Sequence, residues 1–197
     1  MKSNVCKIEK GTLDLNAILK ESEKVAVYNE LDNNQTLKLR LICEELDGML
    51  PNVVDKFNGD FWIEFENGVC KINVSIEFEE FTANKKKELV RFSKNKKNAA
   101  TAGIFGKIRS FIEDCFLDSE NAKFYDMAGL YNFANEYAVC TDYSYMWSFE
   151  QYKNFIKTEE EKQEWDELEK SIISSFADDV IVGVKGKRAS IVIIKKF

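Results

Sequence analysis

The sequence contains no histidine, one proline and only nine glycines among its 197 residues. The absence of histidine excludes imidazole acid–base catalysis, the Ser-His and Cys-His nucleophile pairs, and most zinc sites. The low glycine and proline content argues against linker-like or low-complexity segments. Any chemistry would therefore depend on carboxylates, lysines or a bound cofactor.

Long apolar runs and paired cysteine motifs are also missing. No segment reaches the roughly 18 apolar residues that a membrane-spanning helix needs, and residues 1–15 lack the apolar core of a secretion signal. We therefore expect a cytoplasmic protein with no membrane partner. The five cysteines form no CxxC pair, and we expect reduced, mostly buried thiols: Cys6, Cys43, Cys70, Cys115 and Cys140.

The composition is that of a folded domain. Hydrophobic residues make up 45% of the chain and aromatic residues 13%, which provides enough apolar surface for a core and argues against disorder. The net charge of −6 discourages non-specific binding to nucleic acid. We therefore predict no nucleic-acid partner. The length suits one domain with an insertion, so we predict a single domain over residues 1–197.

Two helices are predicted near the start of the chain. Thr12 and Asp14 are candidate N-caps for the first helix. The second helix is predicted from Thr36 onward, where apolar residues recur at helical spacing. Pro51 predicts a kink or a break near Leu50, because proline lacks the N–H group that a helix interior uses.

Strand signals predict two hairpins and a short first strand. The first hairpin turns at Asn67-Gly68, two residue types that tolerate positive φ. The second hairpin turns at the basic segment 185–188. The predicted strands cover residues 4–8, 61–65, 69–78, 179–184 and 189–194.

The segment between the two hairpins has three parts. Residues 84–98 are basic and lead into a helix over 107–117. Residues 118–157 form an aromatic-rich insertion, predicted as short helices, and a charged helix over 158–176 follows. The element order predicts an α+β fold, a two-layer α/β sandwich whose mixed or antiparallel sheet is covered by helices on one face.

This order of elements resembles the GHKL superfamily of histidine-kinase-type ATP-binding domains, and it is nearest to the anti-sigma-factor serine kinases. In that family a long helix carries a Glu that acts as general base and, four residues later, an Asn that binds Mg²⁺. The helix here reads LRLICEELDGML over residues 39–50. Glu45 matches the Glu, and Met49 stands where the Asn would be. The alternative is that Glu44 and Glu45 belong to a solvated helix face. A thioether is not an oxygen ligand for a hard cation, so no metal ligand is predicted.

The strand INVSIEF, residues 72–78, resembles the family strand that leads to the adenine-binding Asp. Glu77 lies near that position, and its carboxylate could accept a hydrogen bond from an adenine amino group. The family's Asp-x-Gly-x-Gly turn does not follow, because the chain continues as Phe-Glu-Glu-Phe. The alternative is that Glu77 is an outward-facing strand residue.

The segment SKNKKNAATAGIFGKIR resembles the family's lid and the glycine-containing start of the next helix. Gly103 and Gly106 would let the backbone approach a phosphate at a helix N-terminus. Lys97 and Lys107 would add positive charge. The resemblance therefore implies ATP or ADP as the cofactor. The alternative is that these lysines belong to a solvated charge run.

Three functions are compatible with the resemblance, which covers residues 1–117 and 158–197. The first is a degenerate, regulatory binding module with weak or no nucleotide hydrolysis, which meets an unidentified protein partner through its aromatic insertion. The second is an active ATP-binding serine kinase of the anti-sigma-factor type, with Glu45 as base. The third is a pocket filled by side chains that binds nothing. The insertion itself is either a partner surface or packing against the core.

Overall fold

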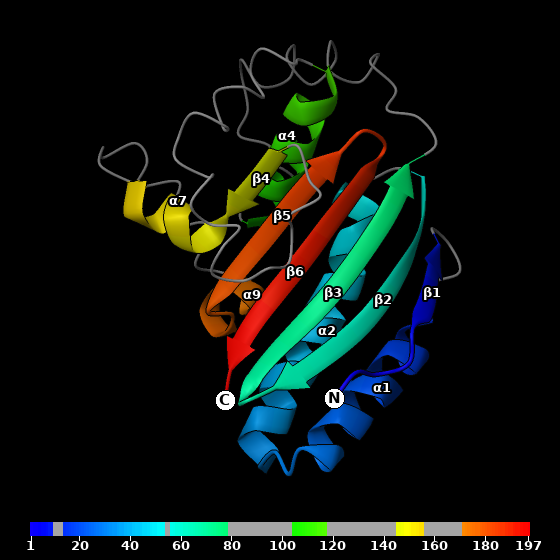
Figure 1. The fold of residues 1–197 in the computed structure, drawn as a ribbon, viewed down its shortest axis with the longest axis vertical. Coiled ribbons are helices and arrows are strands. Elements are labelled where there is room, and N and C mark those ends of the chain that lie inside the picture. The colour runs from blue at the N-terminus through cyan, green and yellow to red at the C-terminus, as the bar shows by residue number, and fades with distance from the viewer. Residues whose placement is uncertain (10–13, 54–55, 79–103, 118–144, 156–170) are drawn as a thin grey trace.

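A computed structural model of the chain describes residues 1–9, 14–53, 56–78, 104–117, 145–155 and 171–197. These residues contain a six-stranded antiparallel sheet with the strand order β1-β2-β3-β6-β5-β4 (Figure 1). The strands are β1 (Cys6–Glu9), β2 (Phe57–Glu66), β3 (Val69–Phe78), β4 (Tyr145–Ser148), β5 (Asp179–Lys185) and β6 (Arg188–Lys196). The α+β class predicted from the sequence is confirmed.

Helices α1, α2, α4 and α9 lie on one face of this sheet, and α7 lies beside β4 (Figure 1). Their bounds are α1 (Leu15–Tyr28), α2 (Asn33–Val53), α4 (Ile104–Leu117), α7 (Phe149–Phe155) and α9 (Ile172–Phe176). Within the described ranges, no helix combines the length and the hydropathy that crossing a bilayer requires.

The helix starts follow from local hydrogen bonds. Asp14, one of the two predicted candidates, is the N-cap of α1, and its carboxylate accepts a hydrogen bond from Ala17 N at 3.2 Å. The other candidate, Thr12, lies outside the described residues. The helix α2 begins three residues before the predicted Thr36. Asp32 Oδ1 accepts from Gln35 N at 2.8 Å and Gln35 Oε1 accepts from Asp32 N at 3.0 Å. This reciprocal capping box satisfies N–H groups that the helix itself cannot pair.

The sequence also predicts a hairpin turn at Asn67-Gly68 and a helix kink or break near Leu50. Asn67 and Gly68 have φ angles of 51° and 75°, and they connect β2 to β3 as the sequence indicates. Of the kink or break predicted near Leu50, the break does not occur there, because α2 continues past Pro51 and ends at Val53.

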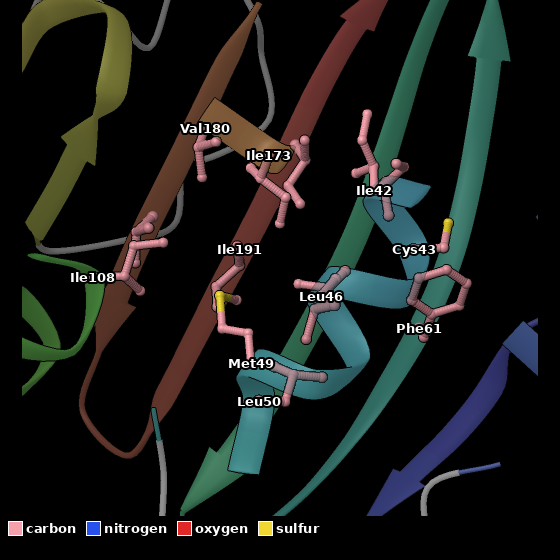
Figure 2. Packing of buried hydrophobic residues seen from close by; sticks show 14 of the residues in the cluster. Ile42, Cys43, Leu46, Met49, Leu50, Phe61, Ile108, Ile173, Val180 and Ile191 are labelled. Carbon is pink, nitrogen blue, oxygen red and sulfur yellow. The ribbon is translucent and has the colours of Figure 1, made fainter. Parts of the chain in front are cut away.

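The main core lies between the sheet and the helices. Every second residue of β3 faces the helices, including Ile72, Val74 and Ile76, because successive strand side chains point to opposite faces. From α2, Leu46, Met49 and Leu50 pack toward the sheet beside Ile191 of β6 (Figure 2). The helical spacing seen in the sequence therefore marks the core face of α2.

A second apolar cluster lies on the opposite face of the sheet. It contains Ile181 of β5 and Val192 and Ile194 of β6, which are 1%, 1% and 0% exposed, and Val69 and Met146 pack against it. Near β1 and β2 the same face carries charged residues, including the ion pair between Lys7 and Asp60. The second face therefore changes from polar to apolar across the sheet.

The strand β4 corrects one prediction for the aromatic insertion. Short helices are predicted for residues 118–157, and α7 is one, but residues 145–148 pair with β5 as an antiparallel edge strand. Tyr145 and Trp147 pack with the main core, whereas Met146 joins the second cluster. This period of two is the strand pattern. Residues 118–144 lie outside the described ranges.

Candidate functional site

Glu45 lies on the flank of α2 that faces α9. Its carboxylate accepts hydrogen bonds from Ser171 Oγ at 3.0 Å, from Ile172 N at 3.1 Å and from Ile173 N. The first N–H groups of a helix have no partner within the helix, and a carboxylate also complements the positive end of the helix dipole. Glu45 therefore holds the start of α9 against α2.

The neighbouring glutamate has a different role. Glu44 Oε1 accepts from Arg40 Nε at 2.9 Å, and Arg40 Nη1 also lies 3.2 Å from Glu23 Oε1 of α1. These side chains are well exposed, so the ion pairs contribute little to stability. Both glutamates are half-buried. The alternative of a solvated helix face describes Glu44, whose contacts are surface ion pairs, better than Glu45, whose carboxylate contacts the start of α9.

Met49 lies in the main core and is 2% exposed. Its side chain packs among the apolar residues between α2 and the sheet (Figure 2). A divalent cation such as Mg²⁺ needs oxygen ligands in octahedral geometry. The residues present at this position therefore do not fit the metal that the GHKL resemblance would place there.

The helix α4 carries two of the predicted phosphate-contacting residues. Gly106 is buried, and Lys107 is half-buried with its Nζ 5.3 Å from the centre of the Tyr152 ring. Because α4 packs against α2, these residues and Glu45 share the helix-covered side of the sheet. Lys97 and Gly103 lie outside the described residues.

Glu77 lies on the other side of the sheet. It is exposed on β3 between Ile76 and Phe78, which both face the helices. Its cross-strand neighbours are Asn58 of β2 and Arg188 of β6. The structure therefore does not bring Glu77 together with Glu45 or with the start of α4, and its position is that of an outward-facing strand residue.

Asp179 is a buried carboxylate, 2% exposed, that was not singled out from the sequence. Its Oδ1 accepts from Glu150 N at 2.9 Å and from Val180 N at 2.7 Å, and Ser148 Oγ donates to both carboxylate oxygens at 3.1 Å. Burial raises the pKa of Asp179, and these hydrogen bonds, with nearby Lys153, partly oppose the rise.

The contacts of Asp179 hold the start of α7 against β5. Ser148 Oγ also accepts from Gln151 N at 3.2 Å, so Ser148 acts as the N-cap of α7. The pattern Ser-x-x-Gln is a sequence signal of a helix start, and it would have placed α7 at residue 149. No local pattern would have identified Asp179 as the other residue that accepts a hydrogen bond from the start of α7.

Asp47, two residues after Glu45, has a buried Oδ1 with no hydrogen-bond partner. Burial raises the pKa of this carboxyl above its ordinary value, because removal from water disfavours the charged form.

No group of three or more carboxylate or thiol side chains in the described ranges could hold a metal ion.

Among the described cysteines, Cys6, Cys43 and Cys70 form no disulfide. Cys43 and Cys70 are buried, as predicted, while Cys6 and Cys115 are half-buried. Burial raises the pKa of Cys70 to about 12 and also raises that of Cys43. Since the thiolate is the reactive form, these two thiols are structural.

The aromatic residues at the described end of the insertion pack on the protein itself. Phe149 is fully buried, and the Trp147 ring lies 6.4 Å from the Phe149 ring and 6.1 Å from the Tyr152 ring, centre to centre. Tyr145 and Tyr152 are partly buried against the main core. For these four residues, packing describes their position better than a partner surface does.

Comparisons of the chain with protein-family models, with curated proteins and with solved structures found no match. The geometry of the described residues is therefore the basis for a functional proposal.

Proposed function

We propose that this chain is a regulatory binding module on a degenerate GHKL-type fold, with weak or no nucleotide hydrolysis. The observation that carries this proposal is the set of hydrogen bonds between the Glu45 carboxylate and the start of α9. A general base must reach the proton that it abstracts, and these contacts direct the carboxylate toward the backbone of α9. The burial of Met49 adds a second argument, because no metal ligand stands at that position.

The proposal includes a cytoplasmic location and a protein partner. Reduced thiols such as those of Cys6, Cys43 and Cys70 are the state that a reducing compartment maintains. We predict the partner contact for the aromatic insertion, residues 118–157, of which residues 118–144 and 156–157 lie outside the described ranges. It is a proposal based on the sequence alone.

Any nucleotide contact in this proposal is limited to ATP or ADP at the start of α4. Gly106 and Lys107 lie there, and Lys97 and Gly103 are proposed from the sequence. Glu77 is not included, because it lies on the face of the sheet opposite the helices, away from the start of α4.

Hydrolysis is best tested with Glu45→Gln. Glutamine retains a carbonyl oxygen that can accept from the N–H groups of α9, but it cannot act as a base. We expect ATP turnover by the wild-type protein in Mg²⁺ to be no higher than turnover by this variant. Mg²⁺-dependent turnover that Glu45→Gln abolishes, with both proteins folded by circular dichroism, would overturn the proposal in favour of the kinase alternative.

Nucleotide binding is measured by thermal shift with ATP and with ADP, each with and without Mg²⁺. A ligand that binds only the folded chain stabilises it, by about 2.7 kcal/mol at a ligand concentration of 100 times Kd. This stabilisation is observed as a rise in melting temperature. We expect a rise that does not depend on Mg²⁺ and that Lys107→Ala reduces. Lys20→Ala, an exposed lysine on α1, is the matched control and should keep it. No rise at millimolar nucleotide would remove ATP and ADP from the proposal and leave a module that binds protein alone.

A further inference from the structure

We draw no further inference here: the strongest candidate, the apolar cluster of Ile181, Val192 and Ile194 on the face of the sheet opposite α2, carries no proposal because nothing in the described part of the structure shows what covers it.

Discussion

Ile193 and Ile194 are neighbours on β6 and point to opposite faces of the sheet, yet both are 0% exposed. Ile193 belongs to the main core beneath the helices, and Ile194 belongs to the second apolar cluster. The helices α1, α2, α4 and α9 explain the burial of the first face only. Equal burial on the two faces therefore has different origins within the same strand.

The sequences of β5 and β6 contain a signal for this two-sided burial. Residues 189–194 read Ala-Ser-Ile-Val-Ile-Ile and residues 180–184 read Val-Ile-Val-Gly-Val, with no alternation of apolar and charged residues. Strands buried on both faces have such continuous apolar runs, whereas strands with one solvated face alternate. In β2 the alternation is retained, and Asp60 on its second face pairs with Lys7 at 2.6 Å.

The largest change in stability is expected in β6, where it tests whether both faces of the strand are equally buried from water in solution. Ile193→Ala and Ile194→Ala remove the same atoms from adjacent positions, so each serves as the control for the other. We expect each to lower the free energy of unfolding by about 2–5 kcal/mol, measured by urea denaturation. A loss below about 1 kcal/mol for Ile194→Ala alone would show that the second face is open to water in solution.

A smaller effect is expected at the hydrogen bonds that hold the helix-covered face together. Glu45→Ala leaves the N–H groups of Ile172 and Ile173 without the carboxylate that accepts from them and should lower the free energy of unfolding by about 1–2 kcal/mol. Glu44→Ala removes only an exposed i,i+4 ion pair with Arg40 and should change stability by less than about 0.5 kcal/mol. Equal losses from the two variants in chemical denaturation would contradict the capping role of Glu45.

The smallest effect concerns Asp47, a carboxyl whose desolvation is not offset by a hydrogen bond at Oδ1. The pKa of Asp47 is raised in the folded chain, so protonation of Asp47 favours folding. This contribution to the free energy of unfolding is complete below the ordinary aspartate pKa of about 3.9. It is lost as the pH rises through the pKa of Asp47 in the folded chain. Asp47→Asn should therefore stabilise the protein at pH 7 by roughly 0.5–1 kcal/mol, and the difference from wild type should fall toward zero near pH 4.

Denaturation of both proteins across this pH range gives the test for Asp47. Asp32→Asn is a suitable comparison, because Asp32 is an exposed aspartate that accepts from Gln35 N as a helix cap. An asparagine also caps helices well, so we expect this variant to be about as stable as the wild-type protein at pH 7. A variant at Asp47 that is less stable than wild type at pH 7 would show that its carboxylate has a favourable partner.

The candidate site was harder to predict than the fold. Asp14 as a helix cap and Asn67-Gly68 as a turn could be identified because each acts on residues within a few positions of itself. Glu45 was chosen for its place in a resemblance, and its contacts with α9 could not be foreseen, since Ser171 lies 126 residues later. The general-base role stays a prediction, while the capping contacts are a feature of the structure.

The sequence alone determined the α+β class, the helical faces and the two hairpins, because periodicity and turn residues act over short distances along the chain. Tertiary structure decided which carboxylates are buried and what they bind. Asp179 holds α7 through Ser148, 31 residues before it, and Glu45 holds α9. Such contacts arise only when packing brings a desolvated carboxylate to unpaired backbone N–H groups, and the spacing of residues in the chain does not encode that approach.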